Sequence, residues 1–380
     1  MKKKYIVLSI ITLVLLITFV TSFNYFKTSN NYVEDSVNNQ TKITKGISMN
    51  LEQTAGAGDY KIVTQSNWPT EGYKFNAELS KCENGGEISW DDTKKAVIVS
   101  GNLSDKCYVY FDIYQLTLAE YIKSQYTGTQ GDNALYYHNS TLTNGAGDNS
   151  YRYAGASDSV NNYICLGSDT TTCPDANLFR IIGVFGDKTK VIRAKSVGYQ
   201  QWHTSADNTW SSSSLNAYLN GTYLTSLGTI AEKIATTTWK VGGGSGSNIS
   251  ASVPKTAYKN EVGSSASTTI IDKKIGLMYV SDYGFAASPS AWTKTLGDYD
   301  GTDANGTSIK TINWMYMGYN EWTISRHSDN TNSAFFVNST GNVLGSNVRS
   351  DAGVFPAFNL ESSVKYVSGS GSMSDPVRIN

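Results

Sequence analysis

The sequence predicts a mainly β protein with some helix (α+β), in which a small disulfide-stapled β-sandwich-like domain precedes a larger domain. Aromatic residues make up 12% of the 380 residues, with 25 Tyr against 12 Phe, and aromatic rings are enriched in strands. Short apolar runs alternate with Gly and Asn turn signals, as is typical of antiparallel sheets. Four cysteines at local spacings add the signature of a disulfide-containing protein.

The overall composition excludes two classes of protein. A hydrophobic fraction of 39% is too high for wholesale disorder. A net charge of −1 argues against a nucleic-acid partner, because proteins that bind nucleic acid usually carry a basic face. The length suits two or three domains, each able to bury a core.

The N-terminus predicts an exported protein. Three lysines, Lys2 to Lys4, precede the uncharged stretch Tyr5–Phe23, which as a helix would span roughly 28 Å, close to the thickness of a bilayer. We interpret residues 1–23 as a signal anchor, which fits this length, or as a signal peptide cleaved after the passable site Val20-Thr21-Ser22. The expected location is the cell membrane, single-pass, with the C-terminal portion extracellular, or secreted if the segment is cleaved.

The cysteines agree with export. Of the three possible pairings, Cys82–Cys107 and Cys165–Cys173 are favoured, because each bond stays inside one module. The first would close a loop of about 25 residues, worth roughly 3 kcal/mol in the chain-entropy model. A zinc site would need paired C-x-x-C ligands or nearby histidines, and the sequence has neither. We therefore predict two disulfides and no metal site.

Composition shifts divide the exported part. Residues 24–45 lack periodicity and are interpreted as a flexible spacer. Residues 46–114 are predicted to form the small β domain, since Tyr73 to Leu79 alternates apolar and polar residues. Residues 115–149 are predicted to be a helical connector and loop, opened by a capping box of Thr117 and Glu120 that should dock on the next domain.

Residues 150–380 are predicted to form the large α+β domain. Leu178–Phe185 and Lys190–Ala194 are expected to pair as a hairpin across Gly186, and a helix is expected over about Leu215 to Tyr223. Ile275–Val280 is predicted to be a buried strand. A terminal set of antiparallel strands is expected at Glu321–Arg326, Ala334–Val337, Asn342–Val348 and Val354–Leu360.

Several segments of this large unit resemble an uncharacterised family of exported modules from Firmicutes and Mollicutes-like bacteria, DUF6273 or a close relative. The resemblance rests on a set of motifs: SYRYAG, NNYICLGS, NLFRIIGVF, KIGLMYVSDYGFAASPSAW, WMYMG, EWTISR and GVFPAFNL. The family usually closes on G-V-R-P-A-F-x-L, and Phe355 replaces that arginine here. The closing pattern is also distantly similar to C-type-lectin-like folds, including formylglycine-generating-enzyme-like domains. The resemblance implies a lectin-like fold for residues 150–380. It implies neither the calcium-dependent sugar binding of C-type lectins nor the oxygenase activity of the formylglycine-generating enzymes.

No catalytic constellation is evident. The three histidines, His138, His203 and His327, lie outside any H-E-x-x-H motif, and there is no G-x-S-x-G. The acidic loop that contains Asp300 and Asp303 offers oxygen ligands that calcium accepts. Its spacing differs from the EF-hand pattern, so a turn with solvated acids is favoured and no cofactor is predicted, with calcium as the alternative.

The candidate ligand site lies in the loops between Asp282 and Arg326, which are rich in Gly, Ser, Asp and aromatic residues without a period. Trp292 is the first candidate, because the turn Ser288-Pro289-Ser290 can present its ring to solvent for stacking on a sugar. Asp282 and Asp300 are the polar candidates beside it. The alternative is that these aromatic residues fill the core of a loop-rich domain.

Together these features favour a membrane-tethered surface protein with a binding or adhesive role, whose unknown extracellular ligand is a glycan or another host or envelope component. One alternative is an envelope-acting hydrolase with a dispersed acidic site, which requires two facing carboxylates with raised pKa in a cleft. A second alternative is a purely structural surface protein, which predicts no pocket.

Overall fold

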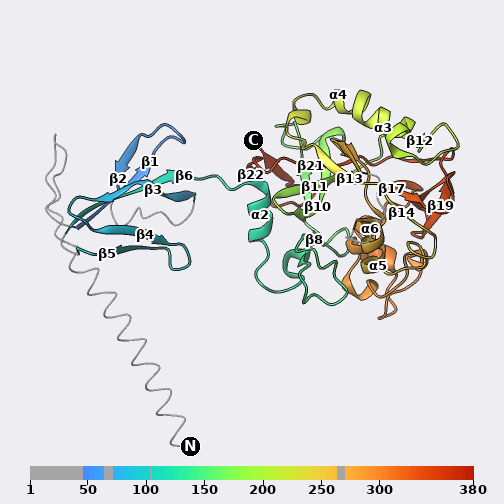
Figure 1. Cartoon of the computed structure of the whole chain (residues 1–380), viewed down its shortest axis with the longest axis horizontal. Helices are drawn as coiled ribbons and strands as arrows, with labels where there is room; N and C mark the ends of the chain where they lie inside the picture. Colours follow the sequence, from blue (N-terminus) through green and yellow to red (C-terminus); the bar gives the residue numbers. More distant parts are fainter. Residues whose placement is uncertain (1–45, 64–71, 103–104, 263–269) are drawn as a thin grey trace, which may run out of the picture. The chain divides into compact units, whose positions relative to one another are not determined.

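The computed structural model describes residues 46–63, 72–102, 105–262 and 270–380, and the chain divides into two compact units between Gln115 and Leu116 (Figure 1). The predicted anchor and spacer, residues 1–45, lie outside these ranges. Within the ranges that are described, no helix combines the length and the hydropathy needed to cross a bilayer.

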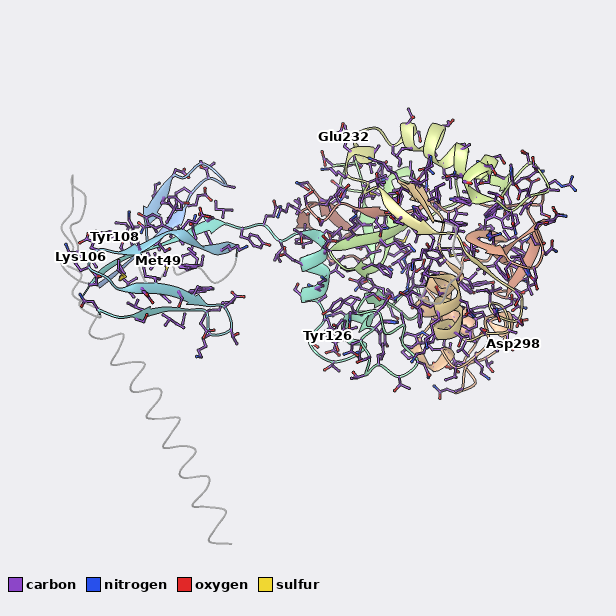
Figure 2. All side chains as sticks on the ribbon, viewed as in Figure 1. Met49, Lys106, Tyr108, Tyr126, Glu232 and Asp298 are labelled. Carbon is purple, nitrogen blue, oxygen red and sulfur yellow. A yellow bond between two sulfur atoms is a disulfide. The ribbon has the colours of Figure 1, made fainter. Side chains whose placement is uncertain are left out.

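The first unit is a four-stranded sheet with a two-stranded hairpin against it. The sheet has the order β2-β1-β6-β3, in which β1 and β6 are parallel and the other pairs antiparallel. Alternate residues of β6 point inward, so that Val109 and Phe111 pack with Met49, which Figure 2 labels, and with Leu51. Trp90 of the hairpin packs edge to face against Phe111, with 5.0 Å between the ring centroids. The strands are β1 (Gly46–Glu52), β2 (Tyr60–Ile62), β3 (Tyr73–Cys82), β4 (Glu87–Asp91), β5 (Ala96–Ser100) and β6 (Lys106–Ile113).

Both predicted disulfides are confirmed. Cys82 and Cys107 are register partners on β3 and β6, and their sulfurs are bonded. Cys165 and Cys173 close a short loop in the second unit. The guanidinium of Arg378 donates to the carbonyl oxygen of Ser168 at 2.6 Å inside that loop. The four cysteines are therefore all bridged.

The second unit begins with α2 (Leu118–Ser124). The predicted capping box is confirmed, since Thr117 accepts from the Glu120 backbone and the Glu120 carboxylate accepts from the Thr117 backbone. Leu118, Ala119 and Ile122 are buried in the core of this unit. The residues predicted as a connector thus pack as part of the larger unit.

A nine-stranded sheet forms the centre of the second unit. Its main path is β16-β21-β11-β10-β9-β23-β22, and β8 pairs with β10 and β7. The predicted hairpin is confirmed as the antiparallel pair β10 and β11, both of which are buried along most of their length. The strands are β7 (Leu135–Tyr137), β8 (Tyr151–Tyr153), β9 (Tyr163–Cys165), β10 (Leu178–Phe185), β11 (Lys188–Arg193), β16 (Ile275–Gly276), β21 (Ala357–Leu360), β22 (Tyr366–Ser368) and β23 (Val377–Ile379).

A second sheet has the order β12-β20-β17-β18-β19, with β14 beside β17, and β13 pairs separately with β15. The predicted terminal set is confirmed for β17, β18 and β19, which are antiparallel neighbours. It is wrong for the last member, because β21 pairs with β11 in the central sheet. The strands are β12 (Tyr199–Gln201), β13 (Thr237–Lys240), β14 (Gly243–Gly244), β15 (Ile270–Lys273), β17 (Glu321–His327), β18 (Ser333–Val337), β19 (Val343–Asn347) and β20 (Asp351–Gly353).

The other helices are short. The expected strand Ile275–Val280 is wrong beyond Gly276, because a capping box of Tyr279 and Asp282 starts α6 at Val280. The helix expected near Leu215 continues through Asn220-Gly221 as a π-helical turn. The helices are α3 (Ser214–Tyr218), α4 (Leu224–Ser226), α5 (Pro254–Glu261) and α6 (Val280–Ala286). Short 3-10 turns lie at Asp132–Ala134, Asp175–Asn177, Trp210–Ser212, Gly228–Glu232, Pro289–Ala291, Leu296–Asp298 and Ile309–Ile312.

One buried carboxyl group of this unit is poorly solvated. Glu321, at the start of β17, is 1% exposed, and its Oε1 atom has no hydrogen-bond partner among the described residues. Burial raises the pKa of Glu321 well above its ordinary value of 4.5. The folded protein therefore keeps a proton that the unfolded chain releases, and stability falls as the pH rises above 4.5.

We expect Glu321→Gln to stabilise the second unit at pH 8 by about 1–2 kcal/mol, because the amide keeps the volume and removes the cost of a buried charge or its protonation. Thermal unfolding should show a melting temperature higher by roughly 2–4 °C per kcal/mol. At pH 4 the two proteins should differ little in melting temperature, since the carboxyl is then largely protonated in the unfolded state as well as in the folded one. A gain that is equal at both pH values would contradict this origin.

Candidate functional site

A pocket of about 220 Å³ opens beside β11, β13, α5 and α6. Its walls combine aromatic rings with charged groups. The aromatic lining residues are Phe185, Trp239, Tyr258 and Tyr279, and the charged ones are Arg152, Lys190, Lys240 and Asp282. Thr237, Thr238, Val262, Ser281 and Asn359 complete the lining. All of these residues lie in the described ranges 105–262 and 270–380.

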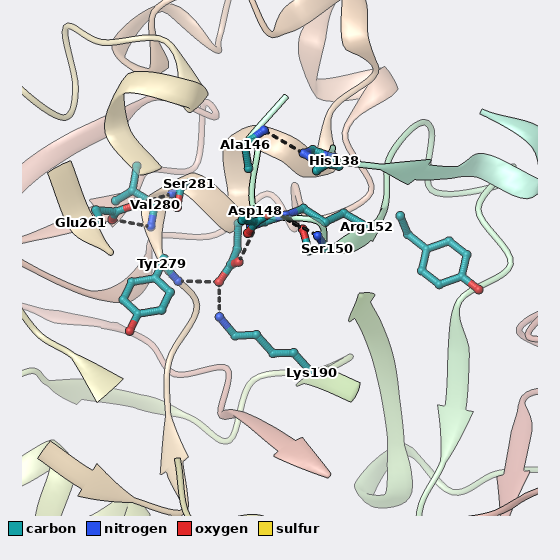
Figure 3. Close-up of polar contacts among 12 residues, drawn as sticks. His138, Ala146, Asp148, Ser150, Arg152, Lys190, Glu261, Tyr279, Val280 and Ser281 are labelled. Atoms are coloured by element: carbon teal, nitrogen blue, oxygen red, sulfur yellow. Dashed lines mark hydrogen bonds and ion pairs between the residues drawn. The ribbon is translucent and has the colours of Figure 1, made fainter. Parts of the chain in front are cut away.

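A buried ion network forms one wall of this pocket (Figure 3). The Asp282 carboxylate accepts from the Lys190 ammonium at 2.5 Å and lies 3.5 Å from the Arg152 guanidinium. Arg152 also donates to Asp148 at 2.7 Å and to the Ser150 hydroxyl at 2.8 Å. The side chains of Arg152, Lys190 and Asp282 are each at most 5% exposed. The network therefore holds its charges away from solvent.

Three different elements bring these charges together. Arg152 lies on β8, Lys190 on β11, and Asp282 in the first turn of α6. The α6 capping box fixes the aspartate, whose carboxylate accepts from the Tyr279 backbone at 2.8 Å. Arg152 is the register partner of Gly183, where a Cβ atom would lie 2.1 Å from a β8 carbonyl oxygen. The glycine thus permits the close approach of β8 to β10 that places the guanidinium.

Aromatic rings surround the two cations. The Arg152 guanidinium carbon lies 4.6 Å from the Phe185 ring centroid and 5.1 Å from that of Tyr258. The Lys190 ammonium lies 4.5 Å from the Tyr279 centroid. These distances are those of cation–π contacts, which gain strength where water is excluded. The rings therefore partly compensate for the lost hydration of both cations.

The pKa values follow from burial and pairing. Burial lowers the pKa of Lys190, and the attraction of Asp282 opposes that shift. For Arg152, burial acts to lower the pKa, but Asp148 and Asp282 outweigh it and the pKa is raised. Burial acts to raise the pKa of Asp148, and Arg152 reverses this, so the pKa lies below its ordinary value. For Asp148 and Arg152, the attraction between the two charges therefore outweighs the effect of burial.

A second buried acid lies behind the pocket. Glu261, at the end of α5, accepts from the backbone N–H groups of Val280 and Ser281, both at 2.9 Å, and from the Ser325 hydroxyl. Burial raises the pKa of Glu261. It caps the start of α6 and does not line the pocket. Its contacts give it a positioning role for the helix that carries Asp282.

The structure separates the three predicted ligand residues. Asp282 lines the pocket, whereas Trp292 and Asp300 do not. The expectation that Trp292 presents its ring to solvent is wrong, because the side chain is 0% exposed and packs in a cluster with Phe285. Asp300 is exposed, and its backbone N–H donates to the Asn342 side chain. Of the predicted set, the pocket keeps Asp282 alone.

Sequence reasoning missed the other charged and aromatic lining residues. A signal was present, because Lys190 directly precedes the apolar pair Val191-Ile192 in a strand and Arg152 lies between two tyrosines in another. Charges in such positions are seldom fully buried without a partner. The partner is distant in sequence, since Lys190 and Asp282 are 92 positions apart.

The acidic loop proposed as an alternative calcium site behaves as a turn where it is described. One Asp303 carboxylate oxygen accepts from the backbone N–H groups of Asn305 and Thr307. Across residues 46–63, 72–102, 105–262 and 270–380, no group of three or more His, Cys, Asp or Glu side chains is arranged to hold a metal ion.

Comparison with known families gives one match. Residues 186–362 match the model of a family described as a domain of unknown function, DUF6273. The chain carries a DUF6273 domain. The matched segment contributes Lys190, Trp239, Tyr258 and Asp282 to the pocket, whereas Arg152 precedes it. No curated protein and no solved structure matches the chain. The C-type-lectin-like fold expected for residues 150–380 stays a prediction.

Proposed function

We propose that this chain is an exported, membrane-tethered surface protein whose DUF6273 domain binds a glycan in the pocket beside β11, β13, α5 and α6. Export is supported by the lysines and the long apolar stretch at the N-terminus and by the two disulfides. The ligand site proposed here therefore differs from the one predicted from the sequence, since Trp292 and the loops that follow it do not line the pocket.

The observation that carries the proposal is the pairing of aromatic walls with hydrogen-bonding groups in one pocket. Phe185 and Tyr258 are only half-buried, so their rings have surface to offer a ligand. The apolar face of a sugar ring packs on such surfaces. Thr237, Thr238 and Asn359 add hydroxyl and amide groups that match sugar hydroxyls.

A hydrolase is less well supported by the same pocket. Glycoside hydrolysis usually needs two carboxyl groups that flank the bond to be broken. Asp282 is the one carboxylate among the described lining residues, and it is held by Lys190 and by the Tyr279 backbone. Asp148 is held by Arg152, and Glu261 accepts hydrogen bonds from the start of α6. The arrangement therefore favours binding over catalysis.

The test is a glycan array probed with the purified full chain and with Thr238→Tyr. Thr238 lines the pocket and is exposed, so a larger side chain there should block entry and leave the fold intact. We expect at least one glycan to bind, and the variant to bind it about tenfold more weakly, a loss of about 1.4 kcal/mol.

The matched control is Thr225→Tyr, which enlarges an exposed threonine on α4 that does not line the pocket. This variant should bind like the unmodified chain. If the unmodified chain binds no glycan, the proposed function is wrong. If both variants bind with full affinity, the glycan site lies elsewhere.

A further inference from the structure

We infer that the sugar taken by this pocket carries a carboxylate, so that the ligand is an acidic glycan with a uronic-acid-type residue; this inference rests on the proposed function. The starting observation is the balance of charge on the pocket walls. Arg152, Lys190 and Lys240 line it as cations, and Asp282 is the one anion among the described lining residues. An excess of positive charge around a pocket favours an anionic ligand.

The two buried cations have donors to spare. An ammonium carries three N–H donors and a guanidinium five. Within the described residues, Lys190 makes one hydrogen bond through its ammonium, to Asp282. Arg152 makes three, to Ser150, Asp282 and Asp148. Each cation therefore keeps two N–H groups for which the described part of the chain provides no acceptor.

Such donors favour a carboxylate over a neutral hydroxyl. Lys190 and Arg152 are 4% and 2% exposed, so water has little access to them. A charged donor that lacks an acceptor in a buried position is costly, and an anionic acceptor forms a shorter, stronger bond than a neutral one. A ligand carboxylate at this wall would fill the unused donors, and the existing bonds to Asp282 could remain.

The aromatic walls argue that the carboxylate belongs to a ring. The Phe185, Tyr258 and Tyr279 rings line the same pocket as the cations, and an inorganic ion would leave these apolar faces uncovered. The pocket volume of about 220 Å³ lies below the roughly 300–1,000 Å³ of sites for drug-sized ligands. It suits a single acidic sugar residue of a longer glycan.

Lys240 gives a means to test the charge without disturbing the buried network. It lines the pocket, is only half-buried, and donates to the Val262 carbonyl oxygen at 2.8 Å. Its ammonium adds positive potential to the pocket. Removing that charge should weaken the binding of an acidic ligand and leave the binding of a neutral ligand unaffected.

The experiment measures binding of methyl glucuronide and methyl glucoside to the full chain by calorimetric titration, together with Lys240→Met. We expect the glucuronide to bind at least about tenfold more tightly than the glucoside. Lys240→Met should weaken glucuronide binding about threefold to tenfold, with the glucoside unchanged. The matched control Lys195→Met removes an exposed cation that does not line the pocket, and should change neither affinity.

The outcomes separate this inference from the proposed function. Equal affinities for the two methyl glycosides, or a preference for neutral glycans on the array, would overturn the acidic ligand and leave glycan binding in place. A preference for the glucuronide that Lys240→Met does not reduce would overturn the placement of the carboxylate in this pocket. Binding to neither glycoside and to no glycan on the array would overturn the proposed function as well.

Discussion

Replacing Asp282 with Ala should destabilise the second unit by about 3–5 kcal/mol, the usual cost of removing one partner from a buried ion pair. The substitution leaves the Lys190 ammonium without its one described acceptor and takes a carboxylate from Arg152. It also removes the side chain that caps α6 by accepting from the Tyr279 backbone. Chemical denaturation followed by tryptophan fluorescence measures the loss directly.

Two further variants serve as controls for this result. Asp300→Ala removes an exposed aspartate outside the ion network, and it should change stability by no more than about 0.5 kcal/mol. Adding Lys190→Met to Asp282→Ala should recover part of the loss, because it removes the unpaired ammonium. Unchanged stability of Asp282→Ala would show that the ion network does not hold this unit together.

Local signals in the sequence were sufficient to predict those parts of the fold that are formed by residues close together in the chain. The β10–β11 hairpin, both disulfides and the Thr117–Glu120 capping box each join residues close in sequence, and all four are confirmed. Their determinants are alternation, turn residues and spacing, which a single sequence displays.

The pocket depends on distant contacts that no local pattern reports. Arg152 and Asp282 are 130 positions apart, and they meet because α6 packs near β8. Asp282 therefore lines the pocket, whereas Trp292 and Asp300, the residues selected with it, do not. The same limit applies to β21, which is next to β20 in sequence but pairs with β11 in the other sheet.

Trp292 shows that an irregular sequence pattern does not predict whether a side chain is exposed. The turn before it suggested exposure, but the residues form a short 3-10 turn over Pro289–Ala291 and the indole that follows is fully buried. Its indole N–H donates to the Ala287 carbonyl oxygen at 2.8 Å, which satisfies the ring's polar atom within the interior. Absence of a period predicts loop structure, whereas burial of a loop depends on what packs over it.

Replacing Trp292 with Ala should therefore cost about 3–5 kcal/mol, the usual range for deleting a buried aromatic side chain. The ring is 0% exposed and makes edge-to-face contacts with Tyr136 and Phe285, both at 5.5 Å between centroids, so its removal leaves a cavity. The melting temperature of the second unit should fall by roughly 6–20 °C. Tyr319→Ala, which removes an aromatic residue that is 54% exposed, is the matched control and should shift it little.

Measuring glycan binding by Trp292→Ala distinguishes a role of Trp292 in the core from a role in ligand contact. Because Trp292 does not line the pocket, the variant should bind glycan with unchanged affinity when measured well below its melting temperature. A variant that melted like the unmodified chain but lost binding would reverse both conclusions, since it would place the indole at the ligand. The expected pattern, lower stability with intact binding, assigns Trp292 to the core and leaves recognition to the pocket formed around Arg152, Lys190 and Asp282.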